Sequence, residues 1–121
     1  MAKPPLKVFH YPKCSTCRKA LKWLDAEGVE HQRVDIVAEP PSVKTLAKVK
    51  KLAGVELRKL FNTSGQSYRQ GGWKDRLGDI SEAEALAALA ADGKLIKRPI
   101  VLGEDVALIG FKAEQWADAL G

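Results

Sequence analysis

Long apolar runs are absent from the sequence, and cysteine and histidine are scarce, with two of each among its 121 residues. No segment approaches the roughly 20 apolar residues that a membrane-spanning helix needs. Residues 1–5 (MAKPP) lead directly into a short apolar segment and lack the apolar core of a secretory signal. We therefore expect a cytoplasmic protein with no membrane partner. In that compartment a cysteine pair is catalytic, redox-sensing or metal-binding more often than structural.

The composition is that of an ordinary globular protein. Hydrophobic residues make up 45% of the chain, charged residues 29% and aromatic residues 7%, which excludes the disordered and fibrous classes. A chain of this length can bury one hydrophobic core but not comfortably two. We expect a single domain over residues 1–121 and a monomer.

The net charge of +5 would suit an acidic partner or a nucleic acid. Part of it is concentrated in one segment, at Lys44, Lys48, Lys50 and Lys51. These lysines alternate with apolar residues as on the solvated face of an amphipathic helix, an interpretation that we favour over a functional basic patch. No nucleic-acid-binding motif accompanies them, so we expect no direct contact with nucleic acid.

The first part of the chain predicts a strand, a helix and a second strand. Residues 6–11 read as a short buried strand that ends at Pro12. Apolar residues then recur at helical spacing over residues 15–27, and Gly28 supplies the stop. Residues 31–37 alternate in polarity as a strand does. This βαβ unit implies that the two strands are parallel.

The remainder predicts a mostly helical middle followed by a hairpin. Ser42 can cap a helix that ends near Gly54, residues 62–65 form a break, and Ser81 with Glu84 has the capping-box pattern of a helix ending at Gly93. Residues 99–102 and 106–109 are apolar runs that read as an antiparallel hairpin, and residues 113–120 close the chain with a short helix. The fold class is therefore α/β.

The chemistry centres on Cys14 and Cys17, which follow the first strand and open the first helix. The positive end of the helix dipole favours the Cys14 thiolate by roughly 0.3 to 2 kcal/mol and so lowers its pKa. Cys17 lies one turn further on the same face, within reach of Cys14 but farther from the exposed terminus. We expect Cys14 to attack and Cys17 to resolve, in reversible disulfide exchange.

Three other interpretations of the cysteines remain open. Together with His10 and His31 they could form a Cys₂His₂ zinc site, although His31 begins the second strand at the far end of the intervening helix. Cys17 could be buried and inert beside a reactive Cys14, or both cysteines could be structural. We expect no metal and no bound cofactor.

A second candidate site lies at Arg98 and Pro99, just before the predicted hairpin. Proline has no N–H to donate to a sheet at that position, and a cis bond before it would form a tight turn. Arginine presents a planar fork suited to oxyanions, so Arg98 could hold a thiolate or an anionic substrate. The alternative is a surface arginine beside a strand.

Four segments of the chain, taken together, point to one family. They are residues 11–20 (YPKCSTCRKA), 62–65 (NTSG), 97–100 (KRPI) and 110–112 (GFK). Through these segments the sequence resembles the arsenate reductase (ArsC)/Spx/MgsR family, and the resemblance extends over nearly the whole chain. The resemblance implies a thioredoxin-like fold, with a helical insertion between its βαβ and ββα halves and a cis-proline beside the cysteines.

The resemblance also implies a chemistry. In glutaredoxin-coupled arsenate reductases one cysteine attacks arsenate, several arginines hold the oxyanion, and glutathione with glutaredoxin completes turnover; Cys14 and Arg98 match that cysteine and one arginine. Where the arsenate reductases have further arginines, this chain has Asn62 and the Gly110-Phe111 pair. The absence of two charge-assisted contacts would weaken oxyanion binding by about 3 to 6 kcal/mol. Cys17 replaces a serine and matches the CxxC of the Spx branch, whose regulators bind RNA polymerase and sense oxidation.

These observations predict a thiol-dependent oxidoreductase of the ArsC family. Arg98 would stabilise negative charge near the sulfur, and Pro99 would shape the site beside it. Ser15 and Thr16 would add hydrogen bonds at the helix start, and Lys13 and Arg18 would contribute modestly to the local field. The electron donor would be glutathione with glutaredoxin, or a thioredoxin. The alternatives are an arsenate reductase and a redox switch that binds RNA polymerase.

Overall fold

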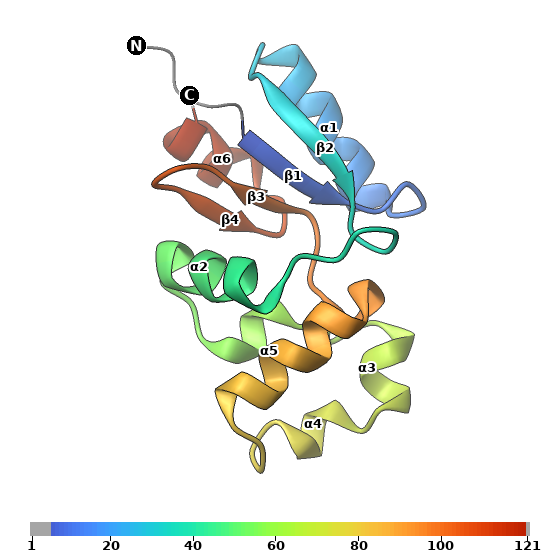
Figure 1. Ribbon diagram of the computed structural model, residues 1–121. Helices are drawn as coiled ribbons and strands as arrows, with labels where there is room; N and C mark the ends of the chain where they lie inside the picture. The colour runs from blue at the N-terminus through green and yellow to red at the C-terminus, as the bar shows by residue number, and fades with distance from the viewer. Residues whose placement is uncertain (1–5, 121) are drawn as a thin grey trace.

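A computed structural model describes residues 6–120, which form a four-stranded sheet covered on both faces by helices (Figure 1). The strands are β1 (Leu6–His10), β2 (His31–Asp35), β3 (Ile100–Leu102) and β4 (Ala107–Ile109). Their order is β2-β1-β3-β4, with β1 parallel to β2 and antiparallel to β3, and β3 antiparallel to β4. This is the predicted thioredoxin-like arrangement of a βαβ and a ββα half.

The helical insertion lies between β2 and β3. It contains the helices α2 (Val43–Ala53), α3 (Gln66–Gln70), α4 (Trp73–Arg76) and α5 (Glu82–Ala91), with the 3-10 helices η1 (Leu57–Leu60) and η2 (Gly93–Leu95). The other two helices are α1 (Ser15–Ala26), which belongs to the βαβ half, and α6 (Ala113–Leu120), which belongs to the ββα half. Both pack on the same face of the sheet. Among the described residues no helix has the length and apolar character to cross a bilayer.

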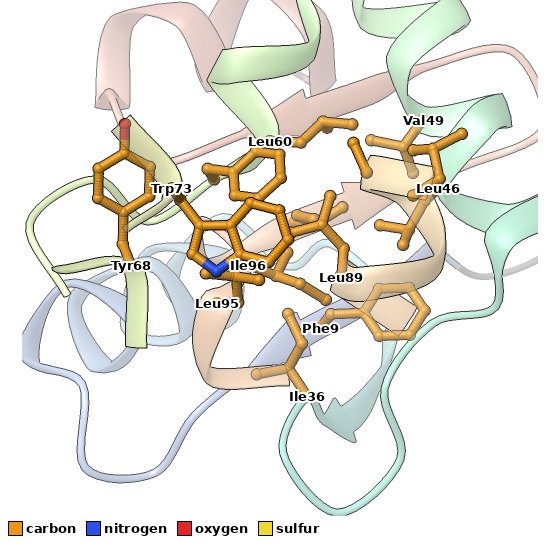
Figure 2. Packing of buried hydrophobic residues seen from close by; sticks show 14 of the residues in the cluster. Phe9, Ile36, Leu46, Val49, Leu60, Tyr68, Trp73, Leu89, Leu95 and Ile96 are labelled. Carbon is orange, nitrogen blue, oxygen red and sulfur yellow. The ribbon is translucent and has the colours of Figure 1, made fainter. Parts of the chain in front are cut away.

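Alternation along the strands divides the buried side chains between two faces. Val8, Val101 and Leu108 pack with α1 and α6, around the fully buried Trp116. Their neighbours Phe9 and Ile100 belong to the cluster on the opposite side, where the insertion packs on the sheet. Figure 2 shows Phe9 among residues of the insertion such as Leu46 and Leu89. Adjacent residues of a strand point to opposite faces, so both sides of the sheet are covered with apolar groups.

The predicted helix caps are present. Ser42 Oγ accepts a hydrogen bond from the Thr45 N–H, and α2 ends at Gly54, whose positive φ of 65° is the left-handed conformation that glycine adopts readily. Ser81 Oγ accepts from the Glu84 N–H at the start of α5. Each such cap contributes about 1 kcal/mol.

Some boundaries differ from the prediction. β2 ends at Asp35 and not Val37, because the Asp35 carboxylate accepts hydrogen bonds from the Val37 and Ala38 N–H groups and turns the chain. The predicted helix ending at Gly93 stops at Ala91, since Asp92 accepts from the Lys94 N–H and starts η2.

The lysines of α2 lie mainly on a solvated face, as expected for an amphipathic helix. Lys44, Lys48 and Lys51 are exposed. Lys50 forms an ion pair with Glu82 of α5, with 3.1 Å between Nζ and Oε1, so one of these lysines connects α2 to α5.

Candidate active site

Cys14 is the N-cap residue of α1. The chain turns after β1, with the Cys14 N–H donating to the Tyr11 carbonyl over 2.9 Å. Cys14 has an extended backbone, and its Sγ accepts a hydrogen bond from the Cys17 N–H at 3.4 Å. The first turn of α1 contains no acidic residue, so no carboxylate there weakens the positive potential that the helix start offers to a thiolate.

The two thiols have opposite environments. Cys14 is partly exposed and Cys17 is fully buried, and both are free. Burial, together with the neighbouring Cys14, raises the pKa of Cys17 to about 12. Burial also acts to raise the pKa of Cys14, but interactions with the Cys17 thiol and backbone N–H and with Arg98 outweigh it, so the pKa lies below its ordinary value. Cys14 is therefore the thiol that ionises first.

Arg98 lies beside Cys14 at the end of the sheet. The antiparallel register pairs Phe9 with Ile100, and continuing it by two residues brings Tyr11 opposite Arg98. The guanidinium carbon lies 4.9 Å from the centroid of the Tyr11 ring, and Nη1 donates to the Lys94 carbonyl over 3.5 Å. Nε is buried and has no hydrogen-bond partner among the described residues. Arg98 thus retains donor capacity that the fold does not use.

Two further backbone segments are fixed beside this arginine. Phe61 pairs with Ile96 in an isolated bridge, and the Asn62 N–H donates to the Leu95 carbonyl over 2.8 Å, which brings Asn62 to the site from the insertion. At the end of β4, the Gly110 N–H donates to the Pro99 carbonyl over 2.8 Å. The Arg98–Pro99 peptide bond is cis.

Gly110 is held from its other side as well. Its carbonyl accepts a hydrogen bond of 3.1 Å from the buried indole Nε1 of Trp116. The next residue, Phe111, packs edge-on against Trp116, with ring centroids 4.9 Å apart, and against Trp23 of α1 at 6.4 Å. The wall of the site formed by Gly110 and Phe111 is therefore anchored in the core.

These segments enclose a cavity of about 320 Å³ at the Cys14 thiol. Three of its lining residues, Lys97, Arg98 and Lys112, carry positive charge, and among the described residues none that lines it is acidic. The full lining is Cys14, Thr16, Asn62, Lys97, Arg98, Ile109, Gly110, Phe111 and Lys112. A nucleophilic sulfur at the edge of a cationic cavity can attack an anionic or disulfide-bearing substrate.

The structure brings together some of the residues that the sequence proposed and separates others. Cys14, Thr16 and Arg98 line the cavity, with Cys17 buried and Pro99 buried beside Arg98. Lys13, Ser15 and Arg18 are exposed and are not part of this lining. No side-chain hydrogen bond of Ser15 or Thr16 is present within residues 6–120.

Sequence reasoning did not assign roles to Tyr11, Lys97 or Lys112. Tyr11 contacts Arg98 through the pairing of β1 with β3, and the hairpin brings Lys112 to the same cavity as Lys97. The available signal was positional: Lys97 precedes Arg98, and Lys112 follows the Gly110-Phe111 pair.

The zinc interpretation has no geometric support in the described part of the chain. Across residues 6–120, no group of three or more His, Cys, Asp or Glu side chains lies close enough to hold a metal ion. His31 Nδ1 is 2.8 Å from the Val29 carbonyl, and His10 lies at the end of β1 near Asp35, with burial lowering its pKa.

Comparison with known proteins identifies the family. The family model described as the ArsC family matches residues 9–119. The chain belongs to the ArsC family. The crystal structure of an ArsC-family-related protein from Bacteroides fragilis superposes on it with a TM-score of 0.91 at 39% identity, covering 97% of this chain and 98% of that one. The Bacillus subtilis protein YusI is 43% identical, over 93% of this ArsC-family chain and 96% of its own length.

Relatives of this ArsC-family chain carry both names that the sequence resemblance suggested. An arsenate reductase of Neisseria meningitidis is 30% identical, over 92% of this chain and 94% of its own length. The global transcriptional regulator Spx of Lactiplantibacillus plantarum is 25% identical, over 89% of this chain and 80% of its own. The predicted family membership is therefore confirmed, and the family contains enzymes as well as regulators.

Proposed function

We propose that this ArsC-family chain is a thiol–disulfide oxidoreductase in which Cys14 is the nucleophile and Cys17 the resolving thiol. The observation that carries the proposal is the asymmetric pair: the partly exposed Cys14 Sγ accepts a hydrogen bond from the N–H of the buried Cys17 at 3.4 Å. One thiol is available to substrate, and the other is held next to it and away from solvent.

The reaction proceeds in two exchanges. The Cys14 thiolate attacks one sulfur of a substrate disulfide, forming a mixed disulfide and releasing the other sulfur as a thiolate. The Cys17 thiol then attacks Cys14 Sγ and its proton passes to the departing sulfur, which releases the second substrate sulfur as a thiol and leaves a Cys14–Cys17 disulfide. The substrate gains two electrons, and an external thiol donor returns the protein to its dithiol form.

Arg98 supports the first step by favouring the thiolate of Cys14. Its guanidinium lies in the same cavity and acts to lower the pKa of that thiol. Thr16, which lines the cavity, would contact the bound substrate, and Pro99 would shape the wall next to Arg98. Lys13, Ser15 and Arg18 are exposed at the start of α1; their contribution would be through the local field and is smaller because solvent screens it.

The donor is a thiol system. The cycle consumes two electrons for each substrate disulfide that is reduced. We propose that glutathione with glutaredoxin, or a thioredoxin, supplies these electrons. Either system would reduce the Cys14–Cys17 disulfide by the same exchange chemistry, since the partly exposed Cys14 sulfur is the one that an incoming thiolate can reach.

The test is to titrate the purified protein in glutathione buffers and to compare two variants. We expect a reversible Cys14–Cys17 disulfide, loss of disulfide reduction in Cys14→Ser, and a stable mixed disulfide with substrate in Cys17→Ser. Full activity in both variants would overturn the assignment. A reversible disulfide without turnover, joined to redox-dependent capture of RNA polymerase, would instead identify a switch of the Spx type.

Arsenate reduction is a second candidate, favoured by the cationic lining of the Cys14 cavity. Lys97, Arg98 and Lys112 could face an oxyanion there. Asn62 is a neutral group in the same lining, so we expect weaker oxyanion binding than a set of arginines provides. Arsenate-dependent oxidation of glutathione in the presence of glutaredoxin, at a rate above that for disulfides, would favour this candidate.

A further inference from the structure

The Cys14 cavity lies next to a second, larger one. The second cavity has a volume of about 520 Å³ and shares Lys97, Ile109 and Lys112 with the first. At its far side it is lined by Arg58 and Lys59 of η1. We call the two together the basic groove; the residues that line it include Cys14 at one cavity and residues of η1 in the insertion at the other.

Positive charge predominates along the basic groove. Arg58, Lys59, Lys97 and Lys112 line the second cavity and are all exposed, whereas Glu56 is the one acidic residue among those that line it in the described chain. Within residues 6–120 the side-chain ion pairs join Arg33 to Asp25 and Lys50 to Glu82. None of the four cations is therefore neutralised by an ion pair of its own.

The fold holds these cations in place through the backbone. The Lys97 N–H donates to the Leu60 carbonyl over 2.7 Å, which fastens the segment between η2 and β3 that carries Lys97 to η1. The stem of Lys97 lies close to Gly110, because a Cβ built on that glycine would be 3.3 Å from the Lys97 Cε atom. The two ends of the basic groove are thus parts of one connected framework.

The groove also offers apolar surface between its charges. Val55, Phe61 and Ile109 line the second cavity, and Phe111 lines the first. Each cavity has a volume in the range of about 300 to 1,000 Å³ in which proteins enclose whole ligands. A disulfide bond needs only the space next to Cys14, so the second cavity is available to the chain that carries the substrate sulfur.

We propose that the basic groove binds an acidic polypeptide segment flanking the cysteine whose disulfide Cys14 attacks. This inference rests on the proposed function and specifies its substrate as a protein with carboxylates near the reactive cysteine. Complementary charge accelerates the encounter and selects among partners more than it adds affinity. The groove would therefore act mainly on the rate of the first exchange.

The experiment follows that exchange in the Cys17→Ser variant, which cannot resolve the mixed disulfide. Synthetic peptides carry one cysteine as a 2-pyridyl disulfide, with glutamates placed before or after it, and matched peptides carry glutamines. Attack by the Cys14 thiolate on the peptide sulfur joins the peptide to the protein and releases pyridine-2-thione, whose absorbance gives the rate. The leaving group is the same and uncharged in every peptide.

We expect the glutamate peptides to react faster at low salt, by about two- to fivefold for each carboxylate that meets a cation. The preference should largely disappear in about 1 M salt, where the Debye length is about 3 Å. In the background of Cys17→Ser, the further changes Arg58→Gln and Lys59→Gln should bring the ratio of the two rates toward one. Glu56→Gln should increase it.

Lys74→Gln is the matched control, because Lys74 is an exposed lysine of α4 that does not line the groove; it should leave the ratio unchanged. Equal rates for glutamate and glutamine peptides would overturn the groove proposal but leave disulfide exchange intact. If the 2-pyridyl disulfide of glutathione reacted as fast as the acidic peptides, the groove would be assigned to a small anionic thiol, and the groove proposal would also be overturned. Failure of every peptide to release pyridine-2-thione would overturn the proposed function itself.

Discussion

The Arg98 guanidinium lies over the ring of Tyr11, 4.9 Å from its centroid, at the point where β1 and β3 diverge. This contact holds the arginine at the cavity that contains the Cys14 thiol. Since a cation over an aromatic face is attracted by about 0.5 to 1 kcal/mol at partly exposed sites, Tyr11 restricts where the charge of Arg98 can lie. The cysteine and the cation are thereby brought together by strand pairing.

Replacing Arg98 by Gln should raise the pKa of Cys14. The arginine is one of the groups that hold this pKa below its ordinary value, so the variant requires a higher pH to form the same fraction of thiolate. The profile of alkylation rate against pH, measured with iodoacetamide, should move to higher pH by a resolvable amount. A matching change in thiolate absorbance would assign the shift to Cys14.

The control for this measurement is Lys74→Gln, which removes a positive charge from α4 and should leave the profile in place. Cys14→Ser should abolish alkylation in the pH range in which the Cys14 thiolate reacts, since burial still raises the pKa of Cys17 and keeps this thiol protonated there. An unchanged profile in Arg98→Gln would show that the helix start and Cys17 alone stabilise the thiolate.

Asn62→Arg should strengthen oxyanion binding in the Cys14 cavity. Asn62 lines that cavity together with Arg98, and a charge-assisted hydrogen bond contributes about 1.5 to 3 kcal/mol, so the gain in affinity should be on the order of tenfold or more. Protection of Cys14 from alkylation by increasing arsenate gives the binding constant. Asn62→Gln is the control of similar polarity, and equal protection in both variants would contradict the expectation.

Trp116→Phe should destabilise the protein and loosen the wall of the site. The Trp116 indole N–H is the donor to the buried Gly110 carbonyl, and leaving that carbonyl unpaired costs about 1 to 3 kcal/mol. Urea denaturation would measure the loss. Trp23→Phe is the control, because the Trp23 indole makes no hydrogen bond within residues 6–120 although it packs on the same rings; an equal loss in both variants would attribute the effect to packing alone.

Local signals made the order of elements predictable from the sequence. Ser42, Ser81, Gly28 and Gly54 act within one helical turn of where they stand. Short apolar runs and, for residues 31–37, alternation indicated the strands without knowledge of their partners. The cysteine pair was found for the same reason: its position at the start of α1 is a local property.

Pairings between distant segments were not predictable in this way. The contact between Tyr11 and Arg98 depends on the register of β1 against β3, and Asn62 reaches the site only because Phe61 bridges to Ile96 across the insertion. Short elements such as α3 and α4 also have too few residues to show a helical period. The places of Lys97 and Lys112 in the cavity therefore emerged only in three dimensions, whereas Arg98 was predicted from the sequence.

Gly93→Ala should be strongly destabilising. Gly93 is buried in η2, and a Cβ at this position would overlap the carbonyl oxygen of Ile36, a backbone atom that cannot rotate away. Separating η2 from the end of β2 to accommodate it should cost about 3 kcal/mol or more, measured as a fall in the free energy of unfolding in urea. Gly78→Ala is the matched control, because the nearest atom to its added Cβ, the Asp75 carbonyl oxygen, is 3.9 Å away; its stability should be unchanged or slightly raised. Equal stability of the two variants would show that η2 can move away from the β2 segment at little cost, and that the insertion is less firmly joined to the sheet than this contact implies.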